Sequence, residues 1–185
     1  MEIAILFLPL LASIISGFFG KYIGDRNSEI ITSLFVSISA GLSLFIFYNV
    51  ILNQYESNVV IATWINSGTL NVNWSIKVDA LSAVMLVVVT LVSALVHIYS
   101  IGYMSHDSHK PRFMAYLSLF TFAMLMLVTS DNFIQLFFGW EGVGLASYLL
   151  IGFWYKKPSA NSAAMKAFIA ALFAVSFLNQ KPIRK

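Results

Sequence analysis

The chain has 185 residues, of which 59% are hydrophobic and only 10% are charged. Soluble domains average about 25% charged residues, so this composition excludes an ordinary soluble domain and indicates a polytopic membrane protein. The net charge is +3, and the Lys and Arg residues lie between apolar segments, where they indicate membrane topology rather than nucleic-acid binding. The sequence contains no cysteine, which excludes disulfides, iron–sulfur ligation and thiolate chemistry in this chain.

Six apolar segments approach the roughly 20 residues that a helix needs to cross a bilayer. We therefore predict an all-α fold, a polytopic membrane bundle of about six transmembrane helices. A polar loop at Asn53–Val78 carries Trp64 and Trp74, which are typical of the membrane interface. The predicted helices are Ile3–Gly20, Ile30–Leu52, Ala80–Met104, Phe113–Thr129, Phe133–Tyr155 and Ala163–Leu178.

Polar residues before three of these segments predict helix starts. Ser28 is the predicted N-cap of the second helix and Asp79 that of the third. The run SDN at 130–132 predicts a tight turn with capping residues, and Asp131 is the predicted cap of the fifth helix.

The distribution of Lys and Arg predicts the orientation. Seven lie in the first, third and fifth loops or close to them: Lys21, Arg26, Lys110, Arg112, Lys156, Lys157 and Lys166. Four belong to the other side: Lys77, Lys181, Arg184 and Lys185. The positive-inside rule therefore predicts a cytoplasmic location for those three loops and an outside N-terminus. The basic C-terminal tail conflicts with this arrangement, because a sixth crossing would export it.

Glu141 is the one charged residue in the fifth segment, within the run GWEGVG at 139–144. Acids at membrane depth are costly and usually mark ion or proton paths. The surrounding glycines allow a neighbouring helix or a water molecule to approach the carboxyl group. Their spacing does not fit a dinucleotide-binding loop, and no strand precedes them. We predict that Glu141 is a proton-relay residue; the alternative is an acid hydrogen-bonded to a neighbouring helix for packing.

Two basic side chains are further relay candidates. Lys166 lies near the start of the sixth segment, where it either extends to the interface or faces the helix of Glu141 and modulates that acid. His97 lies near the end of the third segment and is suited to proton relay, although a structural hydrogen-bonded histidine is the alternative. His97 has no partner ligand at i+3 or i+4, which argues against a metal or haem role.

The remaining polar residues favour simpler interpretations. His106 and His109 flank Asp107 in a short loop, which we interpret as a solvated turn rather than a metal site. Lys110 and Arg112 are interpreted as topology anchors. The sequence shows no nucleophile–base pair, phosphate-binding loop or redox ligand set, so we predict no cofactor, no metal and the movement of ions rather than electrons.

Several motifs together resemble one family. They are DALS (79–82), HIYSIGYM (97–104), RF (112–113), NF (132–133) and GWEGVGLASYLLIGFW (139–154). Residues 1–169 are similar to the L subunit of bacterial proton-pumping NADH:quinone oxidoreductase, respiratory complex I, whose mitochondrial counterpart is subunit 5. Mrp-type cation/proton antiporters are related to this family.

The resemblance implies a membrane-arm subunit that couples NADH-to-quinone electron transfer to proton translocation without holding a redox centre or binding NADH. Glu141 matches a family glutamate of a proton path at mid-depth, which works with a lysine on a later, broken helix. Lys166 matches the family's Lys-Ala-Phe motif and His97 a family pattern position. The implied partners are the lipid bilayer and other membrane-arm subunits, with no nucleic acid. The implied location is the bacterial inner membrane or, alternatively, the mitochondrial inner membrane.

The similarity ends near residue 170. The family continues with Asn/Thr-Arg-x-Gly-Asp, whereas this chain reads AALFAV at 170–175 and ends before the helix that carries the partner lysine. We therefore expect a truncated fragment that cannot pump alone. The expected divisions are N-terminal helices and polar loop at 1–78, the start of an antiporter-like domain at 79–169, and a divergent tail at 170–185.

Two other hypotheses stay open, a stand-alone Mrp-type antiporter subunit and a non-functional decayed gene product. Sodium- or pH-sensitive growth after deletion favours the antiporter subunit. Association with quinone-reducing activity favours complex I. A lack of detectable protein favours the decayed product.

Overall fold

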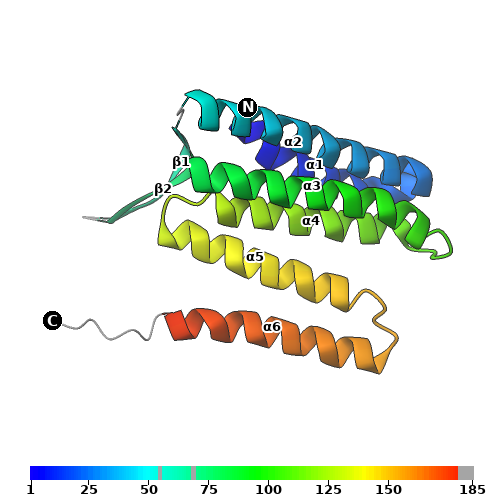
Figure 1. The fold of residues 1–185 in the computed structure, drawn as a ribbon. Helices are drawn as coiled ribbons and strands as arrows, with labels where there is room; N and C mark the ends of the chain where they lie inside the picture. Colours follow the sequence, from blue (N-terminus) through cyan, green and yellow to red (C-terminus); the bar gives the residue numbers. More distant parts are fainter. Residues whose placement is uncertain (54–55, 68–69, 179–185) are drawn as a thin grey trace.

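The computed structural model describes residues 1–53, 56–67 and 70–178 as six helices and a two-stranded hairpin. Successive helices run in opposite directions side by side, and the hairpin lies at the end of the bundle that holds the N-terminus (Figure 1). The predicted helical membrane bundle is confirmed. The elements are α1 (Glu2–Ile23), α2 (Asp25–Asn53), β1 (Ser57–Ser67), β2 (Leu70–Val78), α3 (Ala80–Tyr103), α4 (Lys110–Val128), α5 (Phe133–Ile151) and α6 (Pro158–Leu178).

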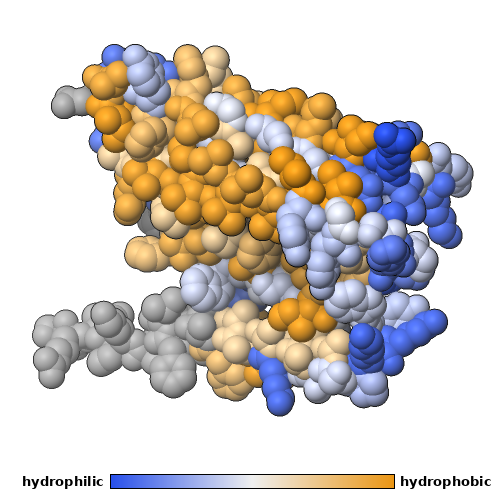
Figure 2. Space-filling view, turned by 45° about the vertical axis from the view of Figure 1, so that its right-hand side comes forward, coloured by the Kyte–Doolittle hydropathy of each residue, from blue (hydrophilic) through white to orange (hydrophobic). Residues whose placement is uncertain are grey.

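The outer surface of the bundle is suited to lipid. Within the described residues, five helices, α1 to α5, are long and apolar enough to span a membrane. Helix α6 begins at Pro158, five residues before the predicted start at Ala163, and its 21 residues extend about 31 Å, the thickness of a bilayer core. Large apolar side chains cover the outer helix faces, while hydrophilic residues gather toward one end of the bundle (Figure 2). The chain is therefore a multi-pass membrane protein.

An apolar cluster joins the first four helices to the hairpin. Its buried members are Ile5, Leu6, Ile46, Val50, Ile76, Val78, Ala83, Leu86, Leu125 and Met126. Helices α2 and α3 are also joined by a hydrogen bond of 2.7 Å between the buried hydroxyls of Ser43 and Thr90. Since lipid is as apolar as a leucine side chain, close packing and such interhelical hydrogen bonds hold the helices together.

The predicted polar loop at Asn53–Val78 is largely a β-hairpin, and the loop prediction was wrong for this segment. Strands β1 and β2 pair antiparallel, with two irregularities in register on the β1 side. Alternate residues of β2 are apolar, and three of them are buried: Val72, Ile76 and Val78. The strand forms because this period of two places its apolar side chains on one face, against the helices.

The starts of α2 and α3 test two predicted caps. The prediction for Ser28 was wrong, because α2 begins at Asp25, directly after Gly24, whose φ of 84° turns the chain out of α1. The prediction for Asp79 is confirmed, since its carboxylate accepts the Ser82 backbone N–H at 2.8 Å. This hydrogen bond holds the pKa of the Asp79 carboxyl below its ordinary value.

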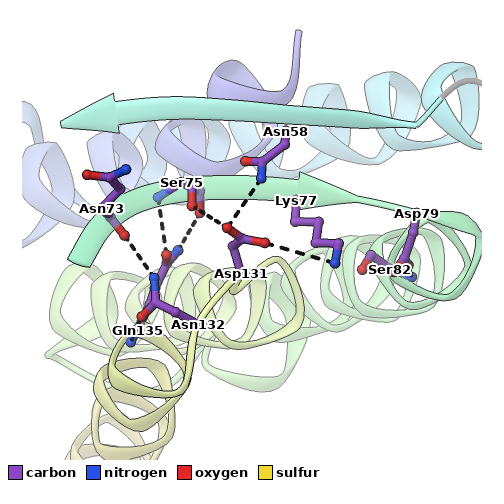
Figure 3. A network of polar contacts seen from close by, with 9 residues as sticks. All are labelled: Asn58, Asn73, Ser75, Lys77, Asp79, Ser82, Asp131, Asn132 and Gln135. Carbon is purple, nitrogen blue, oxygen red and sulfur yellow. Dashed lines mark hydrogen bonds and ion pairs between the residues drawn. The ribbon is translucent and has the colours of Figure 1, made fainter. Parts of the chain in front are cut away.

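The turn between α4 and α5 binds the hairpin. Asn132, rather than the predicted Asp131, caps α5 by accepting a backbone N–H three residues on. Asp131 instead accepts hydrogen bonds from Asn58 and Ser75, each at 3.2 Å, and lies 3.9 Å from the ammonium group of Lys77 (Figure 3). The cap prediction for Asp131 was wrong, because this carboxylate accepts hydrogen bonds from the two strands instead of from the first turn of α5.

Two amide side chains complete the contact between the hairpin and α5 (Figure 3). The buried Gln135 amide donates to the Ser75 carbonyl at 2.7 Å and accepts the Ser75 N–H at 3.2 Å. Asn132 donates to the carbonyl of Asn73 at 2.8 Å. These hydrogen bonds fix the first turn of α5, about 9 Å along the helix from Glu141.

Candidate functional site

Glu141 lies in the middle of α5, between glycines that allow two other helices to come close. A Cβ atom at Gly139 would lie only 2.8 Å from the Leu127 backbone of α4. A Cβ atom at Gly144 would lie 2.8 Å from the Cβ of Ala171 in α6. Glycine is therefore needed at both positions, and α4 and α6 enclose α5 on either side of the acid.

One oxygen of the Glu141 carboxyl group is enclosed within the bundle. Its Oε1 is buried and has no hydrogen-bond partner within the part of the chain that the structure describes. The ion pairs between described side chains are Lys77–Asp131 and Lys110–Glu29, so neither includes Glu141. Leaving a buried acceptor unpaired costs about 1–3 kcal/mol. This oxygen of Glu141 is therefore able to accept a hydrogen bond from a group beyond those described.

His97 lies fully buried between α3 and α4, as part of a polar network. Its Nδ1 lies 2.8 Å from the Ser93 carbonyl, and its Nε2 lies 3.0 Å from the Ser118 hydroxyl. Because a carbonyl oxygen only accepts hydrogen bonds, Nδ1 carries the proton of the neutral ring and Nε2 accepts from Ser118. The Ser93 hydroxyl also contacts the hydroxyl of Thr121, which extends the network along α4.

Helix α4 separates His97 from Glu141. Ser118 of α4 contacts His97, and Leu127 of α4 packs against Gly139, two residues before Glu141. These two α4 residues are nine positions apart and therefore lie on opposite faces of the helix. The two candidates differ in depth by about 10 Å along the helix axis. The structure thus places both residues in the interior of the same bundle without bringing them into contact.

Lys166 lies on a different part of the bundle from Glu141. Helix α6 faces α5 through Phe168, whose ring packs on Tyr148, and through Ala171. Lys166 is exposed on another face of α6. Along the axis of the bundle, it is offset from Glu141 by about two helical turns. The structure therefore does not bring this lysine to the acid.

The loop between α3 and α4 is a hydrogen-bonded turn. Asp107 accepts the backbone N–H of His109 at 2.8 Å and the indole N–H of Trp154 at 3.0 Å. Partial burial opposes ionisation of Asp107, but these hydrogen bonds outweigh it and hold the pKa of the carboxyl below its ordinary value. His106 is exposed beside this turn. Among the described residues, no three His, Asp or Glu side chains form a group that could hold a metal.

Two charged contacts go beyond the predicted role of topology anchors. Lys110 lies 4.0 Å from the buried Glu29 of α2, which fell outside the predicted second helix. The Arg112 guanidinium donates to the Phe153 carbonyl at 3.0 Å. No local pattern in the sequence indicates either contact, because each joins segments that are far apart in the chain.

Comparison with known proteins places the chain among respiratory membrane subunits. Residues 64–114 match the family model of the NADH-ubiquinone oxidoreductase (complex I) chain 5 N-terminus. Residues 130–179 match the transmembrane family model of NADH:quinone oxidoreductase and the Mrp antiporter. One solved structure, an archaeal membrane-bound sulfane sulfur reductase complex, shares the fold with a TM-score of 0.72 at 16% identity, over 91% of this chain and 34% of that chain.

Curated relatives are more similar in sequence. Chain 5 of NADH-ubiquinone oxidoreductase from Arabidopsis thaliana is 56% identical over 169 residues, which cover 91% of this chain and 25% of the relative. Subunit L of NADH-quinone oxidoreductase from Rickettsia conorii is 55% identical over 167 residues, covering 90% and 25%. The chain thus spans about a quarter of the length of the curated relatives it matches. With the two family models and the shared helical fold, these similarities confirm the predicted resemblance: the chain belongs to the family of complex I chain 5 and subunit L.

Proposed function

We propose that this chain is part of the membrane arm of a proton-translocating NADH:quinone oxidoreductase, in a bacterial or mitochondrial inner membrane, and that Glu141 is its proton-relay residue. The observation that supports this proposal is the buried Oε1 of Glu141, which has no hydrogen-bond partner among the described residues and lies in the middle of an apolar helix. Family membership supplies the context, because the relatives are chains of that oxidoreductase. In this proposal, NADH binding and electron transfer belong to other subunits.

The chemistry of the proposed relay requires two groups. In this proposal, the carboxyl group of Glu141 carries the proton, and a positive charge that approaches it triggers the release. The approaching cation favours the carboxylate, and the proton leaves along a polar path. Because the described residues place no cation in an ion pair with Glu141, we propose that translocation needs a lysine that the described part of the chain does not supply.

His97 and Lys166 have lesser roles in the proposal. His97 is a second relay position, since its ring joins hydroxyl groups on α3 and α4 that can pass a proton between them. Lys166 modulates the relay only through a partner that docks on the exposed face of α6, because this lysine does not reach Glu141 within the chain.

Replacing the acid tests the proposal. In membrane vesicles that contain the assembled oxidoreductase, Glu141→Gln is expected to lower the NADH-driven proton gradient by about tenfold or more, because an amide cannot release a proton to the path. The measurement is quenching of a pH-sensitive dye after addition of NADH, with the amount of assembled complex checked in parallel. Glu56→Gln is the matched control, since Glu56 is exposed outside the helices.

Two outcomes contradict the proposal. The first is a Glu141→Gln complex that assembles normally and keeps the full proton gradient. The second concerns the purified chain alone in liposomes, for which we expect no gradient. Proton movement by the isolated chain that is lost in Glu141→Gln shows that no partner cation is needed.

An Mrp-type cation/proton antiporter subunit is the second candidate, because the family model that matches residues 130–179 covers both kinds of protein. This alternative predicts that deletion of the gene makes growth sensitive to sodium or alkaline pH while NADH-dependent quinone reduction stays normal. Loss of NADH-driven pumping without salt sensitivity favours the oxidoreductase.

A further inference from the structure

Arg112 at the start of α4 holds an unusually placed positive charge. One of its terminal nitrogens donates to the Phe153 carbonyl at 3.0 Å, and the guanidinium lies over the rings of Phe153 and Tyr155 at 4.7 Å and 5.5 Å. The Nε atom is buried and has no hydrogen-bond partner in the described part of the chain. The Asp107 carboxylate interacts electrostatically with this charge, but it accepts its hydrogen bonds from His109 and Trp154. The arginine therefore has donor capacity left.

A cavity of about 170 Å³ lies beside this arginine, between α4, α5 and α6. Its lining includes the polar residues Arg112, Tyr116, Tyr148 and Asn161. The cavity is at the end of the bundle where α4 and α6 begin and α5 ends, and the ends of membrane-spanning helices lie at the depth of lipid headgroups.

Further positive charge lies at the same end of the bundle as the cavity. Lys156 and Lys157 are exposed in the segment that joins α5 to α6, directly after the aromatic residues that stack on Arg112. The Lys157 ammonium lies over the ring of Trp154 at 5.2 Å. Two exposed lysines therefore add to the attraction of an anion toward this end of the bundle.

This arrangement fits a phosphate ester. The fork of a guanidinium matches two oxygens of a phosphate, and tyrosine and tryptophan rings are favoured at the membrane interface. Basic pockets between transmembrane helices recognise anionic lipid headgroups. We propose that the cavity binds the phosphate of an anionic phospholipid headgroup, with Arg112 as its principal ligand. The proposal is independent of the role of Glu141.

Lipid retention by the purified full chain tests this site. The chain is extracted into detergent with a mixture of phosphatidylglycerol and phosphatidylcholine, and native mass spectrometry counts the bound lipids. We expect wild type to retain phosphatidylglycerol selectively and Arg112→Gln to bind it about tenfold more weakly, because a charge-assisted contact is lost. Arg26→Gln is the matched control, as Arg26 is exposed at the same end of the bundle; it is expected to keep selective binding.

A second variant and a second ligand make the outcome decisive. Arg112→Lys keeps the charge but loses the fork, so we expect binding between that of wild type and Arg112→Gln, with an unchanged melting temperature in lipid-free detergent.

Equal retention of both lipids by wild type, or equal weakening by Arg112→Gln and Arg26→Gln, overturns the proposal. Inorganic phosphate that displaces the lipid at low concentration shows a free-phosphate site and overturns the lipid assignment. Failure of phosphatidylglycerol to bind the folded wild-type chain also overturns the proposal.

Discussion

The contact of Gly139 with the backbone of Leu127 sets the distance between α4 and α5 beside the acid of the candidate relay. Backbone atoms cannot move aside as a flexible side chain can, so any side chain at this position must push the helices apart. We predict that Gly139→Ala lowers the free energy of unfolding by about 1–3 kcal/mol through overpacking. Thermal melting of the purified chain in detergent, followed by circular dichroism, measures the change.

Gly41 in α2 provides the control for Gly139. A Cβ atom at Gly41 would meet nothing within 4 Å, so Gly41→Ala adds only helix propensity. It is expected to leave stability unchanged or to raise it by up to about 1 kcal/mol. Equal effects of the two alanine substitutions show that the close approach of α4 and α5 is not required.

At the scale of elements, hydrogen bonds from the hairpin hold the first turn of α5 in place. Gln135 satisfies both the N–H and the carbonyl of Ser75, and all of these groups are buried. We predict that Gln135→Leu costs about 2 kcal/mol or more, because two backbone groups of β2 lose their partner away from water. Hydrogen exchange at the Ser75 amide measures the local opening, and a thermal melt measures the global effect.

The control for this element lies on the same strand. Asn71 is exposed on the polar side of β2, and Asn71→Leu is expected to change stability by less than about 0.5 kcal/mol. If Gln135→Leu leaves hydrogen exchange at Ser75 as slow as in wild type, the hairpin is held by its apolar face instead.

Most of the helical elements follow from the sequence, because a span of the right length and hydropathy is a local property. The predicted third helix differs from α3 by one residue at its end, and Asp79 caps it as expected. The hairpin also has a local signal, since residues 71–78 alternate polar and apolar side chains along β2. Strand β1 lacks such a signal, because the irregularities in its register break the alternation.

The candidate site could be predicted only in part. Glu141 is conspicuous in any reading of the sequence, because a single acid interrupts a long apolar segment. Its surroundings are not local: Gly139 requires glycine because of a residue on α4, and His97 meets Ser118 across two helices. The placement of Lys166 likewise depends on the rotation of α6 against α5. The rotation and the register of one helix against another are set by side-chain packing, and this packing cannot be deduced from a single sequence.

At the scale of the whole molecule, the two ends of the bundle differ in charge. Lys156 and Lys157 lie at the end formed by the third and fifth loops, together with the enclosed Arg112 and with Lys110, whose charge is partly balanced by Glu29 at 4.0 Å. At the other end, Lys77 lies 3.9 Å from Asp131 and its charge is partly balanced. A membrane protein with this asymmetry is expected to keep the basic end in the cytoplasm, or in the mitochondrial matrix, with the hairpin on the opposite side.

Single cysteines can test this orientation directly, because the chain has none of its own. Glu56 precedes the hairpin and Ser108 lies in the loop between α3 and α4, and both are exposed. In intact bacterial cells with a permeable outer layer, a membrane-impermeant maleimide is expected to label Glu56→Cys but to label Ser108→Cys only after the membrane is disrupted. The unmodified chain should stay unlabelled in both conditions. The reverse pattern contradicts the predicted orientation and shows that the basic end faces outward. Labelling of both positions in intact cells shows instead that the chain has not inserted in a single direction, in which case a proton path through Glu141 has no defined polarity.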